Sequence, residues 1–271
     1  MKVIAVALTA MLAASCGQKK DAPKVLVLYY SQTGNTKAVA QEIATALGAD
    51  MEEIVPVEPY GGTYEETIQR CIREREEGIL PPIQPVNASI ADYDVVFVGY
   101  PVWFGTCALP MLTCLGETDL AGKKVVPFCT FGSGGLQSST ADIVKKQPGA
   151  EVLPGYGVRA ARMAAMPEEL DRFLKESGFL EGDFVKLQDF PEPHDVNEEE
   201  SAIFDAAVDG YRMLSAKASK VASRTIPGGT EYEFTALTAP FGPNPDSRMM
   251  EITVYVTVKD GEAPVFTQVV R

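Results

Sequence analysis

The chain has 271 residues, of which 46% are hydrophobic and 23% are charged. This composition is ordinary for a globular protein in water, and it excludes a disordered chain, a collagen-like repeat and a multi-span membrane protein. The formal net charge of −13 would repel a nucleic-acid backbone, so we expect no nucleic-acid partner.

Residues 1–15 have the pattern of an export signal. Lys2 precedes an almost uninterrupted apolar run from Val3 to Ala14, which is too short to anchor the chain in a bilayer. The run ends in small residues directly before Cys16, which resembles a bacterial lipoprotein signal in which Cys16 carries the lipid. Residues 16–23 would be a tether, and the protein would be exported and held in the bacterial cell envelope by this lipid anchor only. A plain cleaved signal peptide, with no role for Cys16, is the alternative.

Strand-like and helix-like segments alternate from Lys24 to Gly178, which predicts an α/β fold with a parallel sheet and helices on both faces. The expected strands are 24–30, 51–57, 94–100, 125–130 and 151–158. The expected helices are 36–47, 64–77, 137–146 and 167–177, with one more that carries Cys107 and Cys114.

Polar residues crowd the point where the first strand meets the first helix. Hydroxyls, an amide and a glycine at a helix N-terminus favour an anion such as phosphate, because the backbone N–H groups there lack partners. The alternative is an ordinary capped turn. The candidate phosphate-binding residues are Ser31, Gln32, Thr33, Gly34, Asn35 and Thr36.

The third strand leads into a segment that holds the only tryptophan of the chain. Aromatic residues beside proline and glycine form a stiff turn that can present a ring face and N–H groups to a flat heterocycle. The alternative is that these aromatic rings pack in the core. The candidate binding residues are Pro101, Val102, Trp103, Phe104 and Gly105.

The fourth strand ends in a glycine-rich loop, which adds stability to neither a strand nor a helix. Its position at the end of a predicted parallel strand places it near the other two segments. The candidate binding residues are Thr130, Phe131, Gly132, Ser133, Gly134 and Gly135.

Together these three segments resemble the flavodoxin family. The family's phosphate loop, Ser/Thr-x-Thr-Gly-x-Thr, is matched at Ser31, Thr33, Gly34 and Thr36, and a Gly-Tyr-Pro-x-Trp-x-Gly segment is matched at 99–105. The glycine-rich loop corresponds to a third flavin-contacting loop. The resemblance implies strand order 2-1-3-4-5 and flavin mononucleotide (FMN) in the crevice between the first and third strands.

In this interpretation the flavin carries the redox chemistry, so no catalytic residue is expected in the protein. The function is then electron transfer to a redox partner protein. Two alternatives remain open: an FMN-dependent reductase that reduces a small molecule such as a quinone with NAD(P)H, and a flavin-free binding lipoprotein. No metal site is expected, because the cysteines form no CxxC pair and His194 is the only histidine. Arg159 and Arg162 could meet an anion or lie on the surface.

The flavodoxin-like domain is expected at 24–186, followed by a linker rich in proline and acidic residues at 187–196. Residues 197–271 are expected to form a small α+β module. Its helix would begin at Asn197 and end near Lys217 and Lys220, in agreement with the helix dipole. Three antiparallel strands would follow at 231–237, 250–258 and 265–270, with a turn-rich loop at 240–245.

Overall fold

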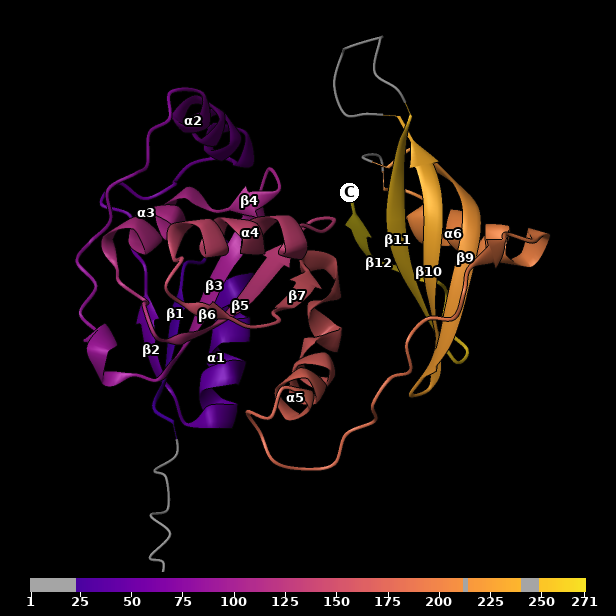
Figure 1. Ribbon diagram of the computed structural model, residues 1–271. Helices are drawn as coiled ribbons and strands as arrows, with labels where there is room; N and C mark the ends of the chain where they lie inside the picture. The colour runs from indigo at the N-terminus through magenta and orange to yellow at the C-terminus, as the bar shows by residue number, and fades with distance from the viewer. Residues whose placement is uncertain (1–22, 212–213, 240–248) are drawn as a thin grey trace, which may run out of the picture.

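The computed structural model describes residues 23–211, 214–239 and 249–271, which form two domains (Figure 1). The predicted signal segment, Cys16, most of the tether and the loop at 240–245 lie outside the described residues. Their assignments stay predictions. In the described ranges, no helix is long and apolar enough to cross a membrane.

The N-terminal domain is built on a parallel sheet. Its strands lie in the order β2-β1-β3-β5-β6, with β7 also paired to β5, which confirms the predicted order 2-1-3-4-5. A two-residue strand, β4, pairs antiparallel with the end of β3. The strands are β1 (Val25–Tyr29), β2 (Asp50–Glu53), β3 (Val95–Trp103), β4 (Thr106–Cys107), β5 (Lys124–Phe131), β6 (Glu151–Val152) and β7 (Tyr156–Arg159).

The predicted fifth strand is split into β6 and β7. Pro154, between β6 and β7, and Pro127, on β5, lack the N–H group that a continuous ladder needs. Gly155 also passes close to β5, since a Cβ atom there would lie 2.5 Å from the carbonyl oxygen of Pro127. The two pieces therefore pair with β5 on either side of an interruption.

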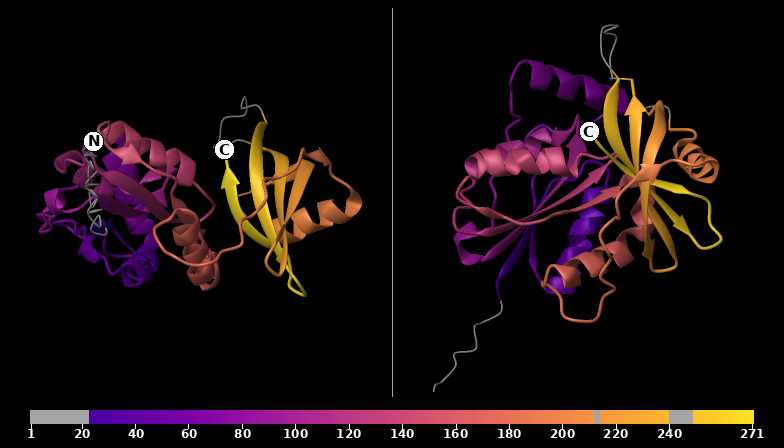
Figure 2. Two further views of the ribbon diagram at one scale, coloured as in Figure 1. Left: turned by 60° about the horizontal axis from the view of Figure 1, so that its bottom comes forward. Right: turned by 45° about the vertical axis from the view of Figure 1, so that its right-hand side comes forward.

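Helices cover both faces of this sheet (Figure 2). In β1, Leu26 and Leu28 face the side of α3 and α4, whereas Val27 and Tyr29 face α1 and α5. This burial on both faces explains why β1 is a continuous apolar run. The helices are α1 (Asn35–Leu47), α2 (Tyr64–Glu76), α3 (Leu109–Glu117), α4 (Leu136–Lys146) and α5 (Met166–Glu176), with short 3-10 turns η1 (Ile90–Asp92) and η2 (Ala160–Ala165).

The C-terminal domain is an antiparallel sheet in the order β12-β11-β10-β9-β8, with α6 packed on one face. The ring centroids of Phe204 on α6 and Phe234 on β10 lie 5.2 Å apart at the centre of this core. The elements are β8 (His194–Asp195), α6 (Glu198–Val208), β9 (Ala216–Ile226), β10 (Gly229–Thr238), β11 (Met250–Lys259) and β12 (Val265–Val270). The predicted strands at 231–237, 250–258 and 265–270 are confirmed.

The predicted helix from Asn197 to Lys217 and Lys220 is wrong in its length. The helix ends at Val208, and both lysines lie on β9. Gly210, with φ 75°, takes the left-handed conformation that commonly ends a helix. Strand β9 is therefore an addition to the three predicted strands, and with β8 the sheet has five strands.

Two smaller expectations also differ from the structure. His194 and Asp195 lie inside the predicted linker but form β8, which pairs with β9. Cys107 lies on β4 rather than on the helix that carries Cys114. Between α5 and β8, residues 177–193 contain no helix or strand.

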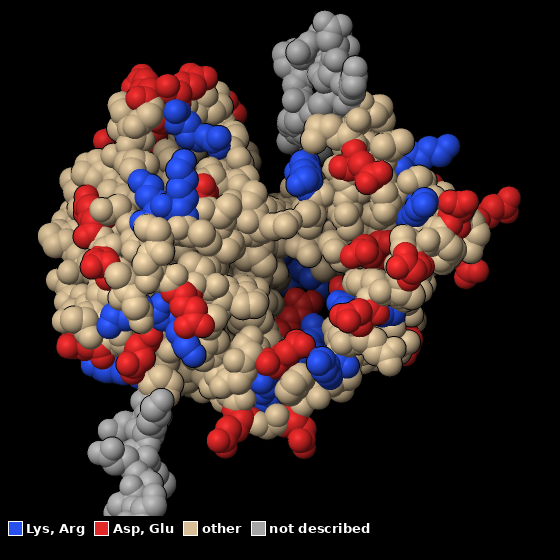
Figure 3. All heavy atoms as spheres, viewed as in Figure 1, with Lys and Arg blue, Asp and Glu red and all other residues tan. Residues whose placement is uncertain are grey.

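Charged residues of both signs are scattered over the face in Figure 3, where a notch separates the two domains above their contact. The contact itself involves β12 and the carboxyl ends of β5 and β7.

Candidate functional site

The three predicted loops follow β1, β3 and β5, which are adjacent parallel strands, so the loops meet at one edge of the sheet. This edge is the usual ligand-binding edge of such sheets.

The first loop leaves the N-terminus of α1 open. Gly34 has φ 89°, no side chain caps the helix, and the first turn has no acidic residue. By contrast, α2 and α6 begin with capping boxes and glutamates. A Cβ atom at Gly34 would meet no atom within 4 Å, so the space before the helix is free. Ser31 Oγ accepts a hydrogen bond from the Lys37 N–H at 3.1 Å. The backbone N–H groups of the loop and helix residues that precede Lys37 remain available for an anion.

A buried pair of hydroxyls joins the first loop to the third. Thr36 Oγ1 and Thr130 Oγ1 lie 2.8 Å apart, and the two residues are 1% and 5% exposed. Because each hydroxyl satisfies the other away from water, the pair holds the start of α1 against the end of β5.

The second segment is the tip of a hairpin between β3 and β4. Both turn residues, Phe104 and Gly105, have positive φ (52° and 80°), which is the property of a type I′ turn. Phe104 is the one non-glycine residue with positive φ in the described ranges, and this conformation costs roughly 1–2 kcal/mol. The residue is 54% exposed, so Phe104 does not pack in the core.

Trp103 lies against two tyrosines and is half-buried. Its ring centroid is 5.7 Å from that of Tyr30 and 5.0 Å from that of Tyr60, in edge-to-face geometry. Gln32 joins the same group, because its amide accepts from the Tyr30 hydroxyl and donates to the Tyr60 carbonyl, each at 2.5 Å. Burial is the largest cause that raises the pKa of both tyrosines well above the usual value, so both stay neutral.

The sequence reasoning missed Tyr60 and its neighbours. The Arg70 guanidinium lies 4.0 Å from the Tyr60 ring centroid and binds Glu74 at 2.8 Å, and Glu74 accepts the Tyr60 hydroxyl. Residues 58–62 and α2 line a cavity of about 370 Å³. The available signal in the sequence is the pair Gly61-Gly62, which lies between the second predicted strand and the second predicted helix and indicates only a turn.

Helix α4 fixes the hairpin in place. Ser138 Oγ donates to the Gly105 carbonyl at 2.6 Å, and Asp142 accepts the Cys107 N–H at 3.1 Å as well as the Thr106 hydroxyl. From α2, Arg75 Nη1 donates to the Phe104 carbonyl at 3.4 Å. The strained turn is therefore held from two sides.

The third loop has a buried start and an open end. Thr130 and Phe131 are buried at the end of β5, Gly132 is exposed, and Gly135 precedes α4 with φ 118° and no side-chain cap. The loop also carries contacts to the C-terminal domain that the sequence did not indicate.

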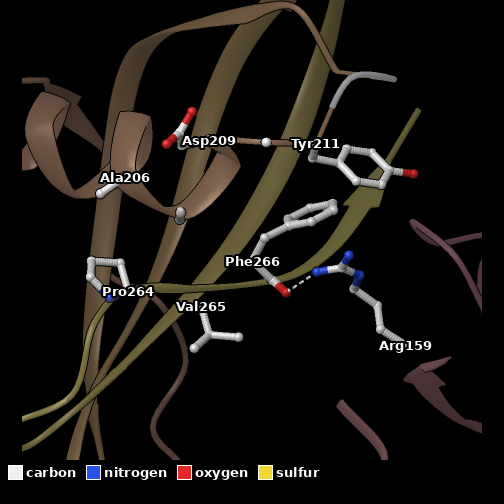
Figure 4. A pocket seen from close by; sticks show the side chains of 9 residues that line it. Arg159, Ala206, Asp209, Tyr211, Pro264, Val265 and Phe266 are labelled. Carbon is white, nitrogen blue, oxygen red and sulfur yellow. Dashed lines mark hydrogen bonds between the residues drawn. The ribbon is translucent and has the colours of Figure 1, made fainter. Parts of the chain in front are cut away.

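Arg159 lies at this domain contact and lines a cavity of about 360 Å³ with residues of α6 and β12 (Figure 4). Its guanidinium lies 4.2 Å from the ring centroid of Phe266 and 5.3 Å from that of Tyr211. Burial lowers the pKa of Arg159. Arg162, by contrast, binds Glu169 at 2.5 Å within the N-terminal domain.

The remaining candidates offer no second reactive centre in the described ranges. No group of three or more His, Cys, Asp or Glu residues there could hold a metal ion. The four cysteines Cys71, Cys107, Cys114 and Cys129 are free and buried, and burial raises the pKa of each thiol, that of Cys71 to about 11. They are therefore poor nucleophiles at neutral pH.

Three solved structures are similar to part of the chain. One, from Bacteroides eggerthii and solved as a candidate flavoprotein, is 31% identical and covers 55% of this chain and 96% of its own, with a TM-score of 0.48. A flavoprotein from Lactobacillus acidophilus, in complex with FMN, is 25% identical and covers 50% of this chain and 93% of its own, with a TM-score of 0.45. Oxidised Flavodoxin 2 from Bacillus cereus is 18% identical and covers 56% of this chain and 99% of its own, with a TM-score of 0.35.

A protein-family comparison gives the assignment. The model described as Flavodoxin matches residues 24–172, which is just over half of the chain and contains all three loops. The chain therefore belongs to the flavodoxin family.

Proposed function

We propose that the protein binds FMN at the edge formed by the three loops and transfers electrons in the bacterial cell envelope. The observation that carries the proposal is the meeting of an open helix N-terminus with two further loops at the carboxyl ends of adjacent parallel strands. FMN is the cofactor of the flavodoxin family, and a similar flavoprotein has been solved with it.

The first loop fits the phosphate of FMN. The uncapped N-terminus of α1 offers backbone N–H groups and the positive end of a helix dipole, with free space at Gly34. The exposed Thr33 hydroxyl can add a hydrogen bond. Because this binding uses N–H groups and hydroxyls, it needs no lysine or arginine despite the acidic chain.

The hairpin tip and the glycine loop fit the flat ring system. Phe104 presents an exposed ring at a turn that is held rigid by α2 and α4, and Trp103 presents a half-buried one. The glycine loop supplies backbone N–H groups close to this turn, because Val102 contacts Gly135. FMN supplies reversible electron transfer when bound, whereas these residues bind it, orient it and limit its contact with water.

An absorption spectrum tests the proposal. The chain from Asp21 onward is purified, mixed with FMN and filtered, and retained visible bands of oxidised flavin are the expected result. A protein that stays colourless would contradict the proposal and favour the flavin-free alternative.

A matched pair of variants locates the phosphate. Thr33→Glu places a negative charge in the exposed loop, and Gln41→Glu places the same charge on an exposed position further along α1. Since a carboxylate at a helix N-terminus does not destabilise the fold, Thr33→Glu should weaken FMN binding about tenfold or more without unfolding the protein. Gln41→Glu should bind FMN as the unmodified chain does.

Assays of quinone reduction and NAD(P)H oxidation by the FMN-loaded protein distinguish an electron carrier from a reductase. Slow electron release to small quinones, with no steady NAD(P)H oxidation, is expected of a carrier that serves a protein partner. Rapid and continuous NAD(P)H oxidation would replace this part of the proposal with the reductase function. Envelope location through Cys16 is tested by metabolic labelling with a fatty acid, which the Cys16→Ser variant should abolish.

A further inference from the structure

The glycine loop Gly132–Gly135 lies between the hairpin and strand β12 of the C-terminal domain. A Cβ atom at Gly135 would lie 2.7 Å from Val102 Cγ1, and one at Gly134 would lie 2.0 Å from the Val269 carbonyl oxygen. Both distances are shorter than real Cβ contacts, so the loop fits between its neighbours only because it lacks side chains there.

Two successive carbonyl groups of this loop accept hydrogen bonds at the domain contact, one from Arg159 of β7 and the other from β12. Arg159 Nε donates to the Gly132 carbonyl at 2.9 Å, and its Nη1 donates to the Phe266 carbonyl at 2.6 Å (Figure 4). The Val269 N–H donates to the Ser133 carbonyl at 2.7 Å. The planar guanidinium of Arg159 therefore joins the loop to β12. A backbone hydrogen bond from the Val269 N–H joins the loop to β12 a second time.

These bonds also set the direction of two N–H groups. In a trans peptide the C=O and the following N–H point in opposite directions, and the described chain has no cis peptide bond. The Gly132 carbonyl points toward Arg159 and the Ser133 carbonyl points toward Val269, so the N–H groups of Ser133 and Gly134 point away from these donors. Neither N–H donates to a protein acceptor in the parts of the chain that the structure describes.

We propose that the C-terminal domain is a clamp that fixes the glycine loop for FMN, with Arg159 and Val269 as positioning residues. This inference rests on the proposed FMN site. The clamp holds two N–H donors ready for the polar edge of the ring, so FMN binds without the cost of ordering the loop. Donors fixed in this way favour the electron-rich reduced ring over the oxidised one.

Two variants open the clamp by different means, each with a matched control. Arg159→Met removes both hydrogen bonds of the guanidinium, and Arg162→Met removes a nearby charge that bonds only within the N-terminal domain. Val269→Pro removes the N–H that binds Ser133. Because β12 is an edge strand and this N–H points away from β11, proline is compatible with the strand. Val269→Ala keeps the N–H while removing buried side-chain volume.

The Kd for FMN and the midpoint potential of the bound flavin are measured on each protein. Hydrogen exchange of the Val269 amide without FMN is measured on the unmodified chain, Arg159→Met and Arg162→Met. Arg159→Met should lose exchange protection at Val269, and both Arg159→Met and Val269→Pro should raise the Kd about tenfold and lower the potential. Arg162→Met should keep the Kd and the potential of the unmodified chain, and Val269→Ala should change both values less than Val269→Pro does. If Val269→Pro fails to fold, Arg159→Met and its control decide alone.

The outcomes distinguish the clamp from the proposed function. Unmodified protein that binds no FMN would overturn the proposed function. The clamp is overturned if Arg159→Met keeps the Val269 protection, or if it loses that protection while its Kd and potential match those of Arg162→Met.

Discussion

The buried hydroxyl pair of Thr36 and Thr130 allows a stringent test of how the first and third loops are joined. Thr36→Val keeps the shape of the side chain but removes one hydroxyl, which leaves the Thr130 hydroxyl buried with no partner. An unsatisfied buried hydroxyl costs about 1–3 kcal/mol. Thr130→Val should cost a similar amount for the same reason.

The double variant Thr36→Val/Thr130→Val should cost less than the sum of the single variants. With both hydroxyls replaced by methyl groups of nearly the same shape, no polar group is left unpaired, and the change can be almost neutral. The interaction free energy from the double-mutant cycle should therefore be about 1–2 kcal/mol in favour of the pair. Urea unfolding of the FMN-free protein measures it, and a loss of 2 kcal/mol moves the midpoint by about 1 M.

Additive single effects would refute the reasoning, since they would mean that the hydroxyls act separately, each through water. FMN titration of the same four proteins then separates folding from binding. If the pair only joins the loops, the double variant should bind FMN almost as well as the unmodified chain.

Three further predictions concern packing, turn strain and pH. Gly99→Ala should destabilise the protein by about 1–3 kcal/mol, because its Cβ would lie 2.0 Å from the buried ring of Phe128, whereas Gly61→Ala, with free space around it, should leave the melting temperature almost unchanged. Phe104→Asn should stabilise the FMN-free protein by about 1 kcal/mol in urea unfolding, because asparagine adopts positive φ more readily than phenylalanine. The same variant should weaken FMN binding, and unchanged binding would show that the Phe104 ring has no role. Burial raises the pKa of the Cys71 thiol from 9.0 to about 11, so between these pH values the folded state keeps a proton that the unfolded state loses. The contribution of this thiol to the unfolding free energy is therefore complete below pH 9 and declines as the pH rises toward 11. The unfolding free energy is measured at one pH below 9 and at one above it, and its decrease should be smaller for Cys71→Ala than for the unmodified chain. An identical decrease in both proteins would contradict the raised pKa of Cys71.

The sequence predicted the N-terminal domain well because its signals are local. Strand β1 is apolar throughout because both of its faces are buried, and the polar loop after it directly precedes a helix. These features depend on neighbours in the chain, so the parallel sheet and the three loops could be located from residue order alone. The split of the fifth strand was missed because it depends in part on the close approach of Gly155 to Pro127 in a different strand.

The C-terminal domain was harder to predict because its signals compete. Residues 216–226 contain alanine, lysine and serine, which are compatible with a helix, and only the pairing with β10 makes them a strand. The role of Gly210 as the end of α6 was overlooked, so the helix was extended too far. Tyr60 was missed as a site component, and Arg159 was expected only to meet an anion or to lie on the surface, because the contacts of both are with residues distant in sequence.

The position of β12 has a further consequence for association between molecules. An edge strand exposes unpaired backbone groups that can recruit a strand of another chain. On β12, the Val269 N–H and the Phe266 carbonyl are occupied by Ser133 and Arg159 of the N-terminal domain. The domain contact therefore shields this edge from intermolecular strand pairing, and a protein whose domains separate should aggregate more readily than either domain's stability alone would suggest.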